Sequence, residues 1–192
     1  MREPLAIDAA VQARADALGF VFAESVREVS PQVAAQLTRT LPGRIARIAV
    51  TLRPSQRRID AMLREFTPDA LQIDVADIAG LRLPQELALL PVLRDGVTMP
   101  ESALPERVLF DAKVSGAGEL SDWSGAQQLA RRTQLVLAGG LAPENVAAAI
   151  SAVQPFGVDV SSGVESARGR KDPERIAQFI AAARRGDGER TT

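Results

Sequence analysis

Residues 134–163 read QLVLAGGLAPENVAAAISAVQPFGVDVSSG. An apolar run from Gln134 ends at Gly139-Gly140, an alanine-rich stretch over 143–153 is typical of a helix, and a second apolar run from Gly157 ends at Ser161-Ser162-Gly163. Apolar runs without alternation are typical of strands that are buried on both faces. A strand, a helix and a second strand in this order predict a right-handed β–α–β unit with parallel strands.

The rest of the chain repeats this alternation of short apolar runs and longer amphipathic stretches. Seven apolar runs predict strands, which begin at Ala17, Ile45, Ala70, Pro91, Arg107, Gln134 and Gly157. Amphipathic stretches predict helices over 5–15, 30–40, 54–66, 123–132, 143–153 and 172–185. One further brief helix is expected after Pro84. Because a helix precedes the first of the seven strands, two architectures remain open: a doubly wound sheet, or a (β/α)₈ barrel without its first strand.

The composition describes one domain. The chain has 192 residues, of which 46% are hydrophobic and 24% charged, and its formal net charge is −1. We therefore expect a single barrel-like domain over 1–185 with a polar tail at 186–192, since single domains run to roughly 100–200 residues. Nothing in the charge favours a nucleic acid or an anionic membrane as partner. No apolar run approaches the ~18 residues of a membrane span, so we expect a cytoplasmic protein.

Three residue types are absent and limit the chemistry. The sequence contains no Cys, no His and no Tyr. The 192 residues therefore contain no disulfide, no metal site with thiolate or imidazole ligands, and no catalytic triad that uses His or Cys. Acid–base chemistry has to be carried by Asp, Glu or Lys.

Two loops rich in small residues follow the last two predicted strands. Gly139 and Gly140 end the first of these strands, and Ser161, Ser162 and Gly163 end the second. Backbone N–H groups in such loops can approach an anion, and the loops after the seventh and eighth strands form the phosphate site of many barrels. Glycines also serve simply to turn a chain, but two such loops on consecutive strands favour phosphate binding.

Charged residues at other strand ends are weaker candidates. Asp111 ends the fifth predicted strand at the edge where barrel active sites lie, although an Asp there can equally cap a loop. Arg27 follows the first predicted strand and could hold a carboxylate. Arg94 has a similar position without independent support. The basic side chains along 53–64 are interpreted as a solvated helix face.

The sequence resembles the phosphoribosylanthranilate isomerases, which are (β/α)₈ barrel enzymes of the ribulose-phosphate-binding type in tryptophan biosynthesis. The resemblance rests on matches that span most of the chain, weakest over 53–106: ADALGFVFA at 15–23, REVSP at 27–31, FDA at 110–112, SDW at 121–123, LAGGL at 137–141, VDVSSGVE at 158–165 and GRKDP at 169–173. Where the family usually has Gln-Leu-His-Gly, this chain has Gln72-Ile73-Asp74-Val75.

The resemblance implies an isomerase of the aldose–ketose type that performs an Amadori rearrangement. It places Asp111 at the general acid that protonates the ribose ring oxygen. Arg27 falls on the residue that holds the anthranilate carboxylate, and Asp159 lines the same pocket. Gly139, Gly140, Ser161, Ser162 and Gly163 fall on the phosphate loops. The implied partner is a phosphorylated small molecule. No metal or organic cofactor is implied, because the substrate supplies its own electron sink.

The resemblance departs from the family at the N-terminus. The family's first strand carries Lys-(apolar)-Cys-Gly with Cys as the general base, and Met1 aligns just after this motif. Three interpretations remain open: a clipped version of an ordinary isomerase, a relative that binds a sugar phosphate without catalysis, or a different enzyme that uses the same phosphate loops with Asp111 as both acid and base. A barrel without its first strand also has unpaired edges that favour pairing with another chain, so either a monomer or a homodimer is expected.

Overall fold

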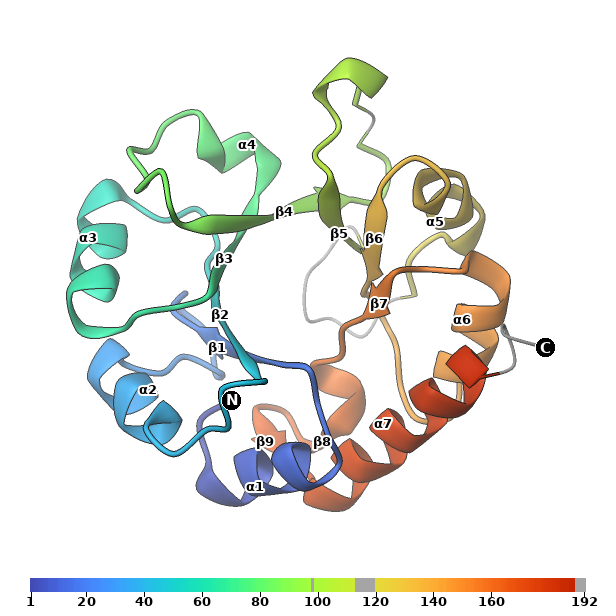
Figure 1. Ribbon diagram of the computed structural model, residues 1–192, viewed down its shortest axis with the longest axis horizontal. Helices are drawn as coiled ribbons and strands as arrows, with labels where there is room; N and C mark the ends of the chain where they lie inside the picture. The colour runs from blue at the N-terminus through green and yellow to red at the C-terminus, as the bar shows by residue number, and fades with distance from the viewer. Residues whose placement is uncertain (98, 113–119, 189–192) are drawn as a thin grey trace.

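The computed structural model describes residues 1–97, 99–112 and 120–188. Its main sheet has seven parallel strands (Figure 1). They are β1 (Ala17–Val21), β2 (Ala46–Val50), β3 (Ala70–Asp74), β4 (Ala88–Arg94), β5 (Arg107–Asp111), β6 (Gln134–Leu137) and β7 (Gly157–Val158). Every strand pairs with the next one along the chain. A doubly wound sheet reverses its strand order at a switch point, so this order excludes that alternative and confirms the seven-stranded barrel type.

Helices cover the outer side of the curled sheet (Figure 1). They are α1 (Pro4–Gln12), α2 (Pro31–Thr38), α3 (Gln56–Glu65), α4 (Val75–Ile78), α5 (Trp123–Ala130), α6 (Val146–Val153) and α7 (Pro173–Gly188), with short 3₁₀ turns η1 (Glu101–Ala103) and η2 (Ser162–Val164). Sequence signals explain their starts: the Ser30 hydroxyl accepts the Val33 N–H at 3.3 Å, with Pro31 at the first helical position. None of the described helices is both long and apolar enough to span a membrane.

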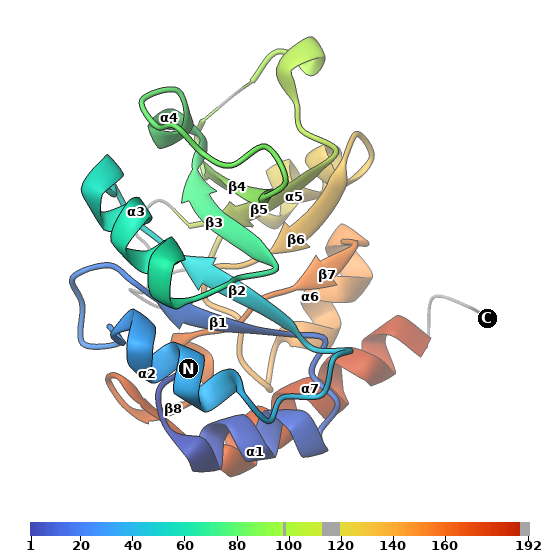
Figure 2. The ribbon, with the colours of Figure 1, turned by 60° about the vertical axis from the view of Figure 1, so that its left-hand side comes forward.

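Strands β1 and β7 are the two edges of the sheet, and no backbone ladder joins them in the described part of the chain. Helices α1 and α7 pack against each other on this side, as both ribbon views show (Figures 1 and 2). The helix that precedes the first strand and the helix that follows the last one therefore cover the region between the unpaired edges.

The structure differs from the sequence pattern in four places. The brief helix expected after Pro84 is wrong: the short helix is α4, directly after β3. Strand β4 begins at Ala88 rather than Pro91, because Leu89 and Leu90 continue the ladder with β3. A hairpin of β8 (Glu165–Ala167) and β9 (Arg170–Lys171) follows η2 and was not expected. Helix α7 also extends three residues beyond Arg185, to Gly188, and 189–192 lie outside the described residues.

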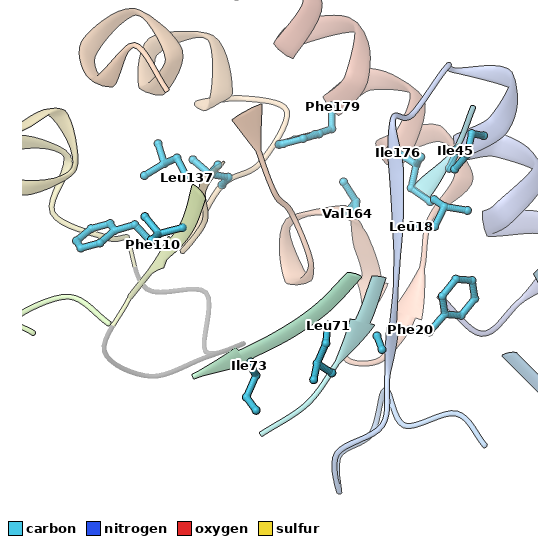
Figure 3. Packing of buried hydrophobic residues seen from close by; sticks show 14 of the residues in the cluster. Leu18, Phe20, Ile45, Leu71, Ile73, Phe110, Leu137, Val164, Ile176 and Phe179 are labelled. Atoms are coloured by element: carbon cyan, nitrogen blue, oxygen red, sulfur yellow. The ribbon is translucent and has the colours of Figure 1, made fainter. Parts of the chain in front are cut away.

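The main hydrophobic core lies between the sheet and its helices (Figure 3). Alternate strand residues such as Leu71 and Leu137 belong to the same cluster as Ile176 and Phe179 of α7. Phe66, at the end of α3, is 2% exposed and joins Phe20 and Phe22, with ring centroids 5.6 and 5.3 Å apart. Such aromatic burial is among the larger single contributions to stability.

A second, small cluster lines the inner face of the sheet. It is built on Val92, Leu109 and Ala138 of neighbouring segments, all of which are buried. Side chains alternate between the two faces of a strand, so the next inner-face positions after Val92 and Leu109 are Arg94 and Asp111. The apolar inner face thus ends in charged residues at the carboxyl ends of the strands.

Candidate active site

Three charged side chains meet at the carboxyl ends of β3, β4 and β5. The Arg94 guanidinium donates from Nε to Asp74 Oδ1 at 3.0 Å and from Nη1 to Asp111 Oδ2 at 2.7 Å. A third contact joins Arg94 Nη2 to Asp74 Oδ1 at 2.9 Å. The three side chains are only 13–20% exposed. In the parallel ladder Arg94 lies opposite Asp111, and Asp74 lies opposite Val92. One guanidinium therefore bridges two carboxylates at the rim of the inner face.

Both carboxyl oxygens of Asp111 are engaged. Oδ1 accepts the Ala112 N–H at 2.9 Å, and Oδ2 accepts from Arg94. The residue as a whole is 9% exposed. An Asp that merely capped its loop would need only the first of these contacts. The second contact fixes the carboxyl group in one orientation at the end of β5.

Asp159 follows β7 on the same inner-face row as Gly157. Asp159 is exposed to solvent although many protein atoms lie around it. Desolvation by these atoms raises the pKa of Asp159, and the nearby Asp111 carboxylate raises it further. The Asp111 carboxylate is thus close enough to act on Asp159, and the two residues lie at the carboxyl ends of β5 and β7.

Arg27 is held by a residue from the other end of the chain. Its Nε and Nη2 donate to the two carboxylate oxygens of Glu165 on β8 at 2.6 and 2.9 Å. Lys171 of β9 donates to the same carboxylate at 3.1 Å and to the Ser161 carbonyl oxygen at 2.7 Å.

Burial alone would raise the pKa of Glu165, but Arg27, the Gly169 N–H and Lys171 lower it to about 2. Burial lowers the pKa of Lys171. Within the described residues, Nη1 is the one guanidinium nitrogen of Arg27 without a hydrogen-bond partner.

The two glycine loops are in direct contact. A Cβ on Gly163 would lie 1.9 Å from the Leu141 carbonyl oxygen. Gly139 and Gly140 have φ angles of 88° and 63°, the region that favours glycine. Asn145 fixes the first loop by accepting the Ala142 N–H at 2.8 Å and donating to the Gly140 carbonyl oxygen at 3.0 Å.

The amide donors of these loops remain available. No hydrogen bond to a described residue engages the backbone N–H of Gly140, Ser162 or Gly163. Unpaired N–H groups in loops of small residues are suited to bind a phosphate. The structure thus brings together the two loops that the sequence singled out, and it links the second of them to Arg27 through Lys171.

One hollow of the surface lies away from these residues. It measures about 650 Å³ and is lined by residues at the opposite, amino ends of the strands, among them Glu106, Thr133 and Gln134. Active sites of barrels lie at the carboxyl ends, and the converging carboxylates lie there too. This hollow therefore does not mark the candidate site, and the chemistry of the strand ends does. No three carboxylate side chains of the described residues converge as ligands for a metal ion.

Sequence reasoning gave too little weight to four residues of this site. Arg94 had only its strand-end position in its favour, and no role could be given to Asp74. Glu165 and Lys171 were noted only as parts of longer motifs. One signal could have found the first two: Arg94 and Asp111 each end a predicted strand and Asp74 directly follows one, so parallel pairing places their strand ends side by side.

Comparisons with known proteins agree with this geometry. Residues 1–182 match the family model of N-(5′-phosphoribosyl)anthranilate (PRA) isomerase. The isomerase of that name from Pelobacter propionicus is 37% identical over 196 residues, which cover 95% of this chain and 91% of the relative. The crystal structure of phosphoribosyl anthranilate isomerase from Thermotoga maritima is 30% identical, with a TM-score of 0.79 and coverages of 96% and 95%. A solved complex of such an isomerase with reduced 1-(o-carboxyphenylamino)-1-deoxyribulose 5-phosphate is 29% identical, with a TM-score of 0.77 and the same coverages.

Proposed function

This chain belongs to the N-(5′-phosphoribosyl)anthranilate isomerase family, and we propose that it serves that isomerisation step of tryptophan biosynthesis through the strand-end site described above. One observation carries the proposal: the two glycine loops touch at the same end of the sheet as Asp111, which ends β5, and Asp159, which follows β7. An aldose–ketose isomerisation of a sugar phosphate requires a proton donor, a base and a hold on the phosphate, and this arrangement supplies the first and the last of these.

The residues take the following roles. The N–H groups of the loops at Gly139-Gly140 and Ser161-Ser162-Gly163 bind the phosphate and so place the ribose over the inner face. Asp111 donates its proton to the ring oxygen, which opens the ring to the Schiff base. Arg27 holds the anthranilate carboxylate through Nη1, the nitrogen that Glu165 leaves free. Asp159 lines the pocket beneath the sugar.

The C2′ proton must also be removed. In the family this is the task of the cysteine in the Lys-(apolar)-Cys-Gly motif, which aligns ahead of Met1. The present chain contains no cysteine. The proposal for these 192 residues therefore covers phosphate binding, carboxylate binding and the acid step.

Binding and turnover test the proposal separately. Calorimetry of the chain with reduced 1-(o-carboxyphenylamino)-1-deoxyribulose 5-phosphate should show binding that competes with inorganic phosphate. Turnover is measured after extension of the N-terminus by a strand with the family motif, by following the loss of substrate fluorescence. Asp111→Asn should then lower kcat by roughly 10²–10⁴. Asp60→Asn, on the outer helix α3, is the control and should leave kcat unchanged.

Two outcomes would contradict the proposal. A folded, extended protein that binds the analogue without turnover would favour a non-catalytic sugar-phosphate-binding relative. A folded chain that binds neither the analogue nor phosphate would contradict both candidate functions.

A further inference from the structure

We propose that Glu165 is a positioning residue that fixes the free edge of the Arg27 guanidinium, and that Lys171 ties this edge to the second phosphate loop. The site then prefers phosphorylated ligands that also carry a carboxylate. The inference rests on the proposed function in assigning the carboxylate to Arg27 and the phosphate to the loops. Neither Glu165 nor Lys171 needs to touch the ligand, because both act through contacts within the protein.

The carboxylate of Glu165 is fully occupied by protein donors. Its Oε1 accepts from Arg27 Nε at 2.6 Å and from Lys171 Nζ at 3.1 Å. Its Oε2 accepts from Arg27 Nη2 at 2.9 Å and from the Gly169 N–H at 3.0 Å. The two oxygens of a carboxylate offer about four lone-pair sites, and the Glu165 side chain is only 4% exposed. Glu165 therefore acts through its protein partners and not by contact with a ligand.

The contact with Glu165 determines which edge of Arg27 remains for a ligand. A guanidinium is planar, and its donors form a rigid fork. Glu165 occupies the edge made by Nε and Nη2, so the remaining edge is made by Nη1 and the second N–H of Nη2. This edge presents two parallel N–H groups, the arrangement that binds both oxygens of a carboxylate. Without Glu165 the guanidinium could rotate, and the edge would no longer be held in one direction.

The β8–β9 hairpin also fits closely against the loop that carries Arg27. A Cβ on Gly169 would lie 2.9 Å from the Val26 carbonyl oxygen, and the φ angle of Gly169 is 83°, in the region that favours glycine. The backbone N–H of Arg27 donates to Ser25 Oγ at 3.1 Å. Both the backbone and the side chain of Arg27 are thus held, so the fold sets the position of the guanidinium before a ligand binds.

Lys171 joins this arrangement to the second phosphate loop. Its Nζ donates to the Ser161 carbonyl oxygen at 2.7 Å, to Ser161 Oγ at 3.3 Å and to Glu165 Oε1 at 3.1 Å. The C=O and N–H of a trans peptide point in opposite directions, so the Ser162 N–H is directed away from Lys171. One side chain thus orients a phosphate donor and holds the carboxylate that fixes Arg27.

Two ligands that differ only in the carboxylate measure the effect of Glu165. The carboxy analogue is reduced 1-(o-carboxyphenylamino)-1-deoxyribulose 5-phosphate, and the phenyl analogue is the same compound without the carboxylate. Calorimetry of the 192-residue chain gives both dissociation constants, and their ratio is the preference for the carboxylate. In Glu165→Gln this preference should fall roughly tenfold. Either orientation of the amide turns its NH₂ towards one of the two Arg27 donors, so one contact that fixes the guanidinium is lost.

Lys171→Met tests the link to the phosphate loop. The affinity for the phenyl analogue should fall about tenfold, because the Ser161 carbonyl group is no longer held. The preference for the carboxylate should remain, because Arg27 keeps both contacts with Glu165. If Glu165→Gln does not fold, its combination with Lys171→Met removes a donor together with the acceptor. Comparison of this double variant with Lys171→Met then gives the effect of Glu165.

Glu28→Gln is the matched control. Glu28 is adjacent to Arg27 in the chain and binds another arginine, with Oε1 2.6 Å from Arg58 Nη2, but its side chain is 39% exposed. The same substitution there should leave both dissociation constants unchanged. An undiminished preference for the carboxylate after substitution of Glu165 overturns the role of Glu165. Unchanged affinity of Lys171→Met for the phenyl analogue overturns the role of Lys171.

Turnover in the extended protein gives a second readout. A carboxylate that is held equally in the substrate complex and the transition state contributes to KM and not to kcat. Glu165→Gln should therefore raise KM about tenfold with little change in kcat. A merely structural role would lower the amount of folded protein, and so the apparent kcat, without moving KM or the preference between the analogues.

The outcomes for the unsubstituted chain separate this inference from the proposed function. A folded chain that binds neither analogue contradicts the proposed function. A chain that binds both analogues equally well overturns this inference, because Arg27 then holds no carboxylate. A chain that prefers the carboxy analogue, with the same preference in Glu165→Gln, contradicts this inference alone.

Discussion

Gly163 and Leu141 approach each other so closely that a Cβ on Gly163 would lie 1.9 Å from the Leu141 carbonyl oxygen and 3.0 Å from the Ala142 Cα. The neighbouring atoms belong to the backbone, so no side-chain rotation can relieve the overlap. The contact joins the loop after β6 to the η2 turn after β7, and these are the two loops proposed to bind phosphate.

Gly163→Ala should therefore separate the two loops. We expect a loss of about 1–3 kcal/mol in the free energy of unfolding and a fall of about tenfold or more in phosphate affinity. Urea denaturation and calorimetry measure the two effects. Gly43→Ala is the control, because a Cβ at Gly43 meets no atom within 4 Å. Unchanged phosphate affinity in a folded Gly163→Ala protein would show that the loops do not act together.

Glu165 should make stability depend on pH in acid. The pKa of Glu165 is lowered from 4.5 to about 2 in the folded protein, so the unfolded chain binds the proton more tightly. The stabilisation is fully present above pH 4.5 and is lost as the pH falls towards 2. Glu165→Gln should cost about 2 kcal/mol at pH 7, and its difference from the unsubstituted protein should shrink over this range.

Urea denaturation between pH 2 and 7 measures this difference. Glu144→Gln is the comparison, since Glu144 pairs with Arg175 while its side chain is 63% exposed, and exposed pairs contribute little. A constant difference between Glu165→Gln and the unsubstituted protein across the range would refute the assignment.

Asp159→Asn should stabilise the fold while weakening ligand binding. Desolvation and the Asp111 carboxylate raise the pKa of Asp159 above its ordinary 3.8, so ionisation of Asp159 destabilises the folded protein at neutral pH. The free energy of unfolding should rise by only about 0.5 kcal/mol, because solvent reaches the Asp159 side chain and screens its charge. It should disappear below pH 3.8, where Asp159 is protonated in both states.

Thermal denaturation at several pH values and calorimetry with the reduced analogue measure the two effects. Asp8→Asn, on the exposed side of α1, is the control. An Asp159→Asn protein that is less stable at pH 7 would contradict the electrostatic account.

Phe66→Ala should remove the aromatic contact that joins α3 to the first strand. Phe66 packs on Phe20 and Phe22 and is 2% exposed. We expect a loss of about 3–5 kcal/mol in the free energy of unfolding. Phe156→Ala removes the same side chain from a position that is 58% exposed, where Arg107 stacks on the ring, and should cost about 1 kcal/mol or less. Equal losses in the two variants would contradict this account of the core.

Much of the fold follows from local patterns. Five strand starts are predicted correctly, because a buried strand can be recognised from its own run of apolar side chains. They are the starts at Ala17, Ala70, Arg107, Gln134 and Gly157. Strand β4 was placed late because Pro91 reads as a strand boundary, whereas the ladder with β3 continues through it. The β8–β9 hairpin was missed because its two strands are too short to carry an apolar pattern.

The sequence by itself determined that Asp111 ends a strand, that small residues follow β6 and β7, and that acid–base chemistry falls to carboxylates and lysine. These are properties of residue type and position. Only the tertiary structure decided that Arg94 lies between Asp74 and Asp111, and that Arg27 binds Glu165, 138 residues further along the chain. An ion pair depends on which strand ends the curvature of the sheet brings together, and that curvature is a property of all seven strands rather than of any one segment.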